Sequence, residues 1–282
     1  MTIQHECLPC MVQQAVRTAQ MTGAGDPEAL YRRIFEHMSR MDLSRTNPEL
    51  IGENFRIIKE HLGSEDPYRE TKLLYDRRFM AWLEGNEARI PTVKAAVMYA
   101  AAANIIDFNP IHQDVEGQIE RQLAEVSESR FARLDTDRLM ADLAGAKTLL
   151  YLGDNCGEIC FDKLLIRRIR EAFPALKVFY GVRGEPVVND ATLEDARLVG
   201  MEEAAQVIDN GDGSLGTVLS RVSPAFHSVW DSADVVIAKG QGNYESLCEE
   251  SKTMYFLMTV KCAVIARMTG LRQGSLVCMR SR

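Results

Sequence analysis

Two adjacent oxygen-bearing side chains, Asp154 and Asn155, directly follow a short apolar run at residues 148–152. A run of this length and composition predicts a buried parallel strand, so the pair would lie at a strand end. Asp190 stands in the connection that follows the next apolar run, at residues 177–181. Carboxylate and amide oxygens are hard ligands of the kind that Mg²⁺ and Mn²⁺ prefer. Asp154, Asn155 and Asp190 are therefore predicted to hold a divalent metal ion.

The same residues also suit an ordinary helix start. Asp154 and Asn155 could cap a helix that opens at Gly157, because a side-chain oxygen at that position accepts a bond from a free backbone N–H group. Asp190 could likewise begin a helix in which Leu193 faces the sheet. Spacing alone leaves both interpretations open at each place.

Two lysines, Lys239 and Lys261, each follow a further apolar run. A lysine at a strand end can offer a point charge to a phosphate, whereas the ordinary alternative is a surface lysine whose stem lies along apolar neighbours. Gly240 and Gly242 stand near a helix start at Asn243, and glycines there leave backbone N–H groups free to face an anion. This part of the chain is therefore a second candidate for substrate binding.

The chain has seven cysteines, of which Cys7 and Cys10 have the spacing of metal and redox motifs. His5 lies nearby, but a closed zinc site needs four ligands and no second motif of this kind follows. The alternative is a pair of reduced thiols at the start of the first helix.

The elements that must position these residues differ between the two halves of the chain. Before residue 145, start signals such as Asp26-Pro27, Asn47-Pro48 and Asp66-Pro67 open helices with apolar stripes. Further helices are expected at about residues 89–105 and 113–126.

After residue 145, short apolar runs alternate with helical stretches, which is typical of βαβ units in a doubly wound sheet. The sequence predicts an α/β fold: a Rossmann-like, mostly parallel sheet at residues 146–282 that follows an all-helical domain at residues 1–145. Ligands of such sheets bind beyond the carboxyl ends of the strands, where the polar residues gather. The expected strands are residues 148–152, 177–181, 205–208, 234–238, 255–258 and 276–278.

Composition narrows the class of protein. The 282 residues carry 33 Lys and Arg against 40 Asp and Glu, and this net charge of −7 argues against a nucleic-acid partner. No apolar run is long enough to span a membrane, and the start lacks the layout of a signal peptide. A cytoplasmic location is expected, and the oligomeric state is left open.

Three segments, residues 153–158, 189–192 and 239–245, occur in an order that resembles the damage-control phosphatase family, also called domain of unknown function 89. The likeness extends to residues 104–108, to Lys261 with Cys262, and to the amino-terminal Cys-x-x-Cys. It covers nearly the whole chain and is greatest for the prokaryotic branch that bears the Cys-x-x-Cys motif.

The resemblance implies a metal-dependent phosphatase that acts on small phosphorylated metabolites, such as sugar phosphates or damaged cofactor precursors. It implies a helical domain packed on a Rossmann-like domain, with Mn, Ni, Co or Mg held by Asp154, Asn155 and Asp190. Asn104 would lie in the substrate pocket, and Lys261 would be the phosphate-side lysine with Lys239 close by.

Hydrolysis of a phosphate monoester is the expected reaction, with Asp154, Asn155, Asp190, Lys239 and Lys261 as its catalytic residues. The ion would neutralise charge and lower the pKa of the attacking water, while the lysines offset charge on the phosphoryl oxygens. Asp107 or Glu245 could orient that water or the sugar hydroxyls, and the sequence does not choose between them. The expected substrate-binding residues are Asn104, Asp107, Gly240, Asn243 and Glu245.

Two other functions fit parts of the pattern. Residues 152–157 loosely resemble the cofactor loop of S-adenosylmethionine-dependent methyltransferases, although the second strand is not followed directly by the acid that ribose binding uses. A non-catalytic module that binds a sugar phosphate or a metal would need the same pocket. Calorimetry with the cofactor, and a phosphomonoester panel with and without Mn²⁺, would separate these functions from a phosphatase.

Overall fold

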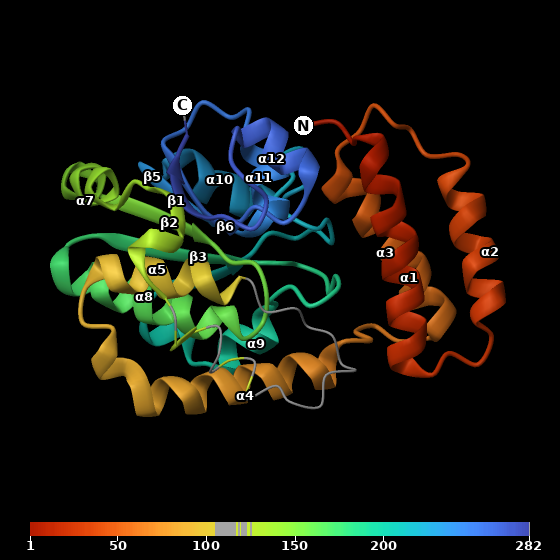
Figure 1. Ribbon diagram of the computed structural model, residues 1–282, viewed down its shortest axis with the longest axis horizontal. Coiled ribbons are helices and arrows are strands. Elements are labelled where there is room, and N and C mark those ends of the chain that lie inside the picture. The colour runs from red at the N-terminus through yellow and green to blue at the C-terminus, as the bar shows by residue number, and fades with distance from the viewer. Residues whose placement is uncertain (105–116, 118, 120–122, 125, 282) are drawn as a thin grey trace.

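Three helices, α1 (Leu8–Thr22), α2 (Pro27–Met38) and α3 (Asn47–Leu62), form a separate group at the amino-terminal end of the computed structural model (Figure 1). The structure describes residues 1–104, 117, 119, 123, 124 and 126–281. Asp107 and most of the helix expected at residues 113–126 therefore lie outside the described residues.

The expected start signals account for two of these helices. Asp26 caps α2 by accepting a bond from the backbone N–H of Ala29 at 3.0 Å. Helix α3 begins one residue earlier than a cap at Asn47 would allow, because Thr46 is its cap and forms a reciprocal capping box with Glu49. Gly63 ends α3 as expected, with φ of +60°.

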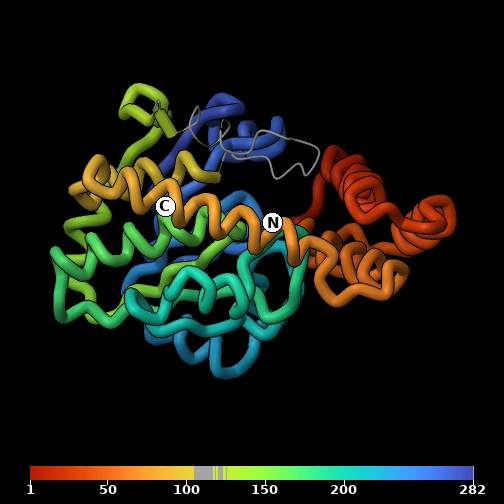
Figure 2. Tube along the Cα trace, turned by 90° about the horizontal axis from the view of Figure 1, so that it is seen from below, coloured from red at the N-terminus to blue at the C-terminus, as the bar shows by residue number. Residues whose placement is uncertain are grey.

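Helix α4 (Arg69–Asn86) is long and leads from the amino-terminal helices along the α/β part of the molecule (Figures 1 and 2). It is followed by α5 (Val93–Ala103), whose residues from Ala96 onward are all buried. Small alanine side chains let α5 approach α8 (Glu158–Ala172) closely, so these helices cover the sheet rather than stand apart from it.

A single seven-stranded sheet has the order β1-β7-β6-β5-β2-β3-β4, and every neighbouring pair is parallel except β6 with β7. The predicted α/β fold with a mostly parallel sheet is confirmed. All six expected strands are present, each within two residues of its expected bounds. The strands are β1 (Phe131–Leu134), β2 (Thr148–Leu152), β3 (Lys177–Val182), β4 (Gln206–Asp209), β5 (Val235–Lys239), β6 (Met254–Thr259) and β7 (Leu276–Arg280).

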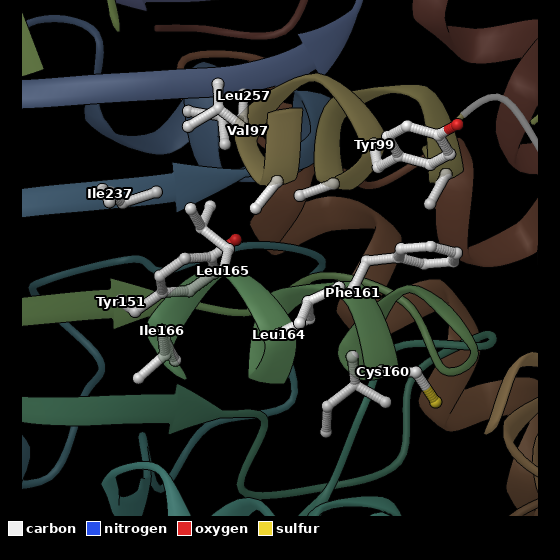
Figure 3. Close-up of a cluster of buried hydrophobic side chains, with 14 of the residues drawn as sticks. Val97, Tyr99, Tyr151, Cys160, Phe161, Leu164, Leu165, Ile166, Ile237 and Leu257 are labelled. Atoms are coloured by element: carbon white, nitrogen blue, oxygen red, sulfur yellow. The ribbon is translucent and has the colours of Figure 1, made fainter. Parts of the chain in front are cut away.

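Helices cover both faces of the sheet, and alternate residues of β2 pack into different cores. Leu149 and Tyr151 join the core under α4, α5 and α8, whereas Leu150 and Leu152 join the core on the opposite face. Figure 3 shows the first of these cores, in which α8 side chains such as Leu165 lie between α5 and the strands. The other helices of this half are α7 (Thr136–Gly145), α9 (Leu193–Leu198), α10 (Pro224–Ser232), α11 (Gly240–Leu247) and α12 (Ala263–Thr269).

The sheet begins before the expected domain boundary at residue 145. Strand β1 pairs in parallel with β7, and helix α7 packs on the first core, although both precede that boundary. Helices α4 and α5 pack into the same core. The helical half of the chain therefore contributes directly to the layers around the sheet.

Strands β2 and β5 lie side by side at the centre of the sheet, and the chain leaves them in opposite directions, toward β3 and toward β6. Connections that diverge in this way leave a crevice beyond the carboxyl ends of the two strands. Asp154 follows β2 and Gly240 follows β5, so the fold brings their turns to that crevice. Among the described residues, no helix is both long and apolar enough to cross a membrane.

Candidate functional site

The turn after β2 is hydrogen-bonded to the turn that holds Asp190. Asn155 and Asp190 form an isolated antiparallel bridge, and the backbone N–H of Ala191 donates to the carbonyl of Asp154 at 2.7 Å. The backbone N–H of Cys156 donates to the carbonyl of Asn189 at 2.9 Å. The structure therefore brings together the two turns that carry the three predicted metal ligands.

Arg183 joins the two carboxylates of the site. Its Nε donates to Asp190 Oδ2 at 2.7 Å, and its Nη2 lies 3.8 Å from Asp154 Oδ1. Its Nη1 also lies 3.3 Å from Thr217 Oγ1 and 3.4 Å from Asn243 Oδ1. The side chain is 2% exposed, and within the described residues its Nη2 has no hydrogen-bond partner.

Two amides orient the Asp154 carboxylate from the side of the helices. Asn104, at the end of α5, donates from Nδ2 to Asp154 Oδ2 at 2.9 Å and to Glu158 Oε1 at 2.8 Å. Asn155 makes the same two bonds, at 2.9 and 2.6 Å. Asn104 is itself fixed by the backbone N–H of Thr259, which donates to its Oδ1. The amides thus fix Asp154 and Glu158 relative to each other.

A second, deeper layer of charge lies beneath Asp154. The Nζ of Lys239 donates to Glu158 Oε2 and to Asp162 Oδ1, both at 2.8 Å, and all three side chains are fully buried. Asp162 also accepts from the hydroxyls of Tyr151 and Tyr180, at 2.7 and 2.9 Å. Every recorded contact of the Lys239 ammonium is therefore with a carboxylate of α8.

Burial dominates the ionisation of these groups. It raises the pKa of Asp154 to about 8, and the nearby charges of Asp190 and Glu158 act in the same direction. Burial also raises the pKa of Asp190, although the Arg183 guanidinium opposes this shift. The pKa of Lys239 is raised, because Asp162 and Glu158 outweigh the effect of its burial. An additional positive charge would favour the ionised form of Asp154.

The donor set fits a hard divalent cation. Four buried carboxylates face the two cations of Arg183 and Lys239, so full ionisation of the carboxylates would leave two negative charges for an ion to balance. No cluster of three or more His, Cys, Asp and Glu side chains with metal-binding geometry occurs within the described part of the chain. Two carboxylates and an amide form a partial set of oxygen donors, which suits a cation that keeps some of its water. The carboxylates are Asp154, Glu158, Asp162 and Asp190.

The start of α11, which directly follows β5, packs against Asp154. A Cβ added at Gly240 would lie 1.9 Å from Asp154 Oδ2, and the residue has φ of +77°. Both the space and the backbone conformation therefore require glycine there.

The other predicted site residues lie at different depths. Lys261 is exposed, and its charge favours the ionised form of Asp154, so it remains available to a substrate. Asn243 is buried and bonds the carbonyls of Gly153 and Lys239 and the hydroxyl of Thr217, which makes it a support of the turns. Their predicted contacts with substrate stay predictions.

Glu245 lies on α11, and its recorded contacts are not with Asp154. It is 4% exposed and accepts from Asn47 Nδ2 at 2.7 Å and from Gln241 Nε2 at 2.8 Å. Burial raises its pKa. These contacts connect α11 with the start of α3, and a contact of Glu245 with substrate stays a prediction.

Three residues of the site were absent from the predicted set: Glu158, Asp162 and Arg183. The two acids are four residues apart on an amphipathic helix, a spacing that is also usual on a solvent-exposed face. Arg183 follows β3, at the same edge of the sheet as the predicted ligands. That position was the signal that could have identified it.

The amino-terminal cysteines are free thiols. Cys7 is buried at the start of α1, and Cys10 is exposed. Burial raises the pKa of Cys7 to about 11, which keeps the thiol protonated. These observations agree with reduced thiols at a helix start, and a metal-binding or redox role of the motif stays untested.

Comparisons with known proteins cover nearly the entire chain. The damage-control phosphatase ARMT1-like domain matches residues 3–277. A damage-control phosphatase of Pyrococcus horikoshii is 34% identical over 292 residues, which span 100% of this chain and 99% of that protein. A damage-control phosphatase of Archaeoglobus fulgidus is 34% identical over 238 residues, which span 82% of this chain and 81% of the relative.

A solved structure with the same fold supports the same family relationship. A crystal structure of a DUF89 family protein from Pyrococcus horikoshii matches with a TM-score of 0.91 at 31% identity, and the match covers 100% of both chains. The resemblance drawn from the three motif segments is confirmed, while a place in the Cys-x-x-Cys-bearing branch stays a prediction. This chain belongs to the damage-control phosphatase ARMT1-like family.

Proposed function

We propose that this protein is a divalent-metal-dependent phosphatase that hydrolyses phosphate monoesters of small metabolites. The observation that carries the proposal is the pairing of Asp154 and Asp190, which belong to two crossover turns and share one arginine. A relative that matches the whole chain is named a damage-control phosphatase, which supports a phosphorylated substrate.

Asp154, Asp190 and the amide oxygen of Asn155 are the proposed metal ligands. A bound divalent ion would neutralise phosphoryl charge and lower the pKa of a water molecule. Asn104 and Asn155 keep Asp154 Oδ2 in a fixed direction through bonds of 2.9 Å each. Such bonds to a ligand carboxylate set its orientation before any ion arrives. The ion itself can be Mn, Ni, Co or Mg, because oxygen donors discriminate weakly among these metals.

Lys261 and Arg183 are the proposed partners of the phosphoryl oxygens. Lys261 is exposed near Asp154, and its ammonium can offset charge that develops during transfer. Arg183 is buried against both carboxylates and has one N–H group without a recorded partner.

Lys239 has a supporting role in this proposal. Its ammonium contacts Glu158 and Asp162 in the interior, and Glu158 in turn accepts from the amides of Asn104 and Asn155. Because it has no exposed surface, its effect on a phosphate would pass through Glu158 rather than through contact. This role differs from the phosphate contact that its position after a strand predicts.

A phosphate-release assay over a panel of sugar phosphates and other phosphomonoesters tests the proposal. Activity should require Mn²⁺, Ni²⁺, Co²⁺ or Mg²⁺, and Asp154→Ala and Asp190→Ala should each abolish it. Asp231→Ala is the matched control, because this acid is exposed and remote from the turns, and it should keep full activity. Full activity of either site variant would remove the metal ligands from the proposal.

Two outcomes would favour other functions. Binding of S-adenosylmethionine in calorimetry would favour a methyltransferase. Binding of metal and phosphate esters without turnover would favour a non-catalytic module.

A further inference from the structure

Helix α4 carries two buried ionisable residues that the proposed reaction does not use. Lys72 and Asp76 are one helical turn apart, and they are 2% and 0% exposed. Figure 1 shows α4 running beneath α8 and α9, the helices that follow the two ligand-bearing turns. Buried ionisable groups need partners that compensate for their loss of water, so those partners identify the segments that Lys72 and Asp76 hold in place.

The first partner of Asp76 is the turn after β2. The backbone N–H of Gly157 donates to Asp76 Oδ1 at 2.6 Å. Gly157 has φ of +69° and precedes the first residue of α8, and the predicted ligand Asn155 lies two residues before it. Asp76 therefore fixes the end of the turn that carries Asp154 and Asn155.

The second partner is Asp195, at the start of α9. Asp195 Oδ2 accepts from the backbone N–H and the hydroxyl of Thr192, both at 2.7 Å, and lies 3.0 Å from Lys72 Nζ. Thr192 stands two residues after Asp190. Asp195 therefore fixes the end of the other ligand-bearing turn.

Asp76 and Asp195 meet between these two turns. Within the described residues, Asp76 Oδ2 is buried and has no donor. Burial and the neighbouring Asp195 carboxylate raise the pKa of Asp76 well above its usual value. Asp195 Oδ2 already accepts from Thr192 and lies against the Lys72 ammonium. A protonated Asp76, with its proton on the unpartnered Oδ2, would donate toward Asp195.

We propose that Asp76 is a positioning residue, which holds the two ligand-bearing turns at a fixed separation through Gly157 on one side and Asp195 on the other. One carboxylic acid thereby accepts from the first turn and donates toward the second. The inference rests on the proposed metal site, because it assigns to α4 the spacing of that site's ligands.

This arrangement predicts different behaviour for two substitutions. Asp76→Asn keeps an oxygen for the Gly157 N–H and places an NH₂ group toward Asp195, so it reproduces the protonated acid. Asp76→Ala removes both bonds and leaves Asp195 with one contact fewer. Loss of a residue that orients metal ligands typically weakens metal affinity by about 10–100-fold.

The experiment measures Mn²⁺ binding directly, by calorimetry or by the electron paramagnetic resonance signal of free Mn²⁺, together with thermal unfolding of each variant. Asp76→Ala should bind Mn²⁺ at least about tenfold more weakly than the unsubstituted protein. Asp76→Asn should stay within about twofold, since it keeps both bonds. Trp82→Leu is the matched control, because it weakens the packing of α4 on Phe161 of α8 without touching either turn.

Each outcome bears on the inference. Unchanged affinity in Asp76→Ala would overturn it, as would Asp76→Asn binding as weakly as Asp76→Ala. An equal loss in Trp82→Leu would reduce the effect to general destabilisation and overturn it as well. No Mn²⁺ binding by the unsubstituted protein would instead overturn the proposed function, and this inference with it.

Discussion

Asp154 has an environment that disfavours its own charge. It is buried, it lies close to Asp190 and Glu158, and its pKa is raised to about 8. Its ionised form therefore lowers the stability of the metal-free protein, and the proposed cation would make that form favourable. Function and stability are therefore opposed at this residue.

Asp154→Asn should separate these two effects. The amide keeps the shape of the side chain without its charge, so Mn²⁺ binding and phosphate release should be lost. The metal-free variant should be more stable at pH 8 than the unsubstituted protein, by roughly 1–3 kcal/mol, as is common when a buried charge is neutralised. Urea unfolding in the presence of a chelator measures this, and a destabilised variant would contradict the assigned ionisation.

Arg183→Met should have the opposite effect on the metal-free protein. Removing the guanidinium leaves Asp190 and Asp154 without their shared cation, which typically costs about 3–5 kcal/mol for a buried pair. Added Mn²⁺ should recover part of that loss, as thermal unfolding with and without the ion would show. Arg221→Met is a control outside the site, since its recorded ion pairs are with Asp212 and Glu53 and not with a proposed ligand. An Arg183→Met variant of unchanged stability would contradict the pairing.

For single residues, the sequence predicted the polar side chains that follow the ends of predicted strands. Asp154 and Asn155 directly follow a buried strand, and Asp190 lies in the connection after the next one, at the edge of the sheet where ligands bind. Glu158 and Asp162 were not predicted, because their inward direction depends on how α8 is rotated against the sheet. Asp76 was not predicted either, since its partner Gly157 is 81 residues away in the chain.

The start of α11 is the element that packs against Asp154. Its backbone must approach the carboxylate closely, and the positive φ of Gly240 makes the approach possible. The glycines of this segment were expected to free N–H groups for an anion. Gly240 serves close packing, and the contact of its N–H with an anion stays a prediction.

Gly240→Ala should weaken Mn²⁺ binding by tenfold or more, on the order of the loss expected when a ligand is misdirected. Its Cβ would displace the Asp154 carboxylate, from which it would lie 1.9 Å away. Gly270→Ala is the matched control, because its φ is +71° but its Cβ would meet nothing within 4 Å. The control should lose only about 1–2 kcal/mol of stability through backbone strain. Equal Mn²⁺ affinities in calorimetry would contradict the packing argument.

Strand positions were predictable because each central strand is an apolar run with a turn at either end. Strand β1 was not predicted, since its four residues include Arg133 and are mostly half-buried at the edge of the sheet. The antiparallel direction of β7 was not predicted either, because direction depends on the connection and not on the strand itself.

The whole molecule should respond to pH and metal together. The pKa of Asp154 is higher in the folded than in the unfolded protein, so the folded form binds a proton that the unfolded form has lost. This contribution to stability is complete below the ordinary range of an aspartate and is lost as pH rises toward about 8. The raised pKa values of Asp190 and Asp162 act with the same sign.

The metal-free protein should therefore lose stability between pH 5 and pH 8, relative to Asp154→Asn under the same conditions. Mn²⁺ should raise the unfolding temperature more at pH 8 than at pH 5, because the ion competes with protons for Asp154. An excess of 100 times the dissociation constant corresponds to about 2.7 kcal/mol of added stability. Differential scanning calorimetry at both pH values tests this, and an equal metal effect at both would contradict it.

Glu158 and its partner Lys239 are 81 residues apart, although they meet in the centre of the molecule. At the usual rate of 5–20 residues per second, the ribosome therefore synthesises Lys239 about 4–16 s after Glu158. Until then the two carboxylates of α8 have no buried cation as partner, so they stay hydrated and α8 does not pack fully on the sheet. The proposed metal site is thus complete only late in synthesis, once β5 has emerged.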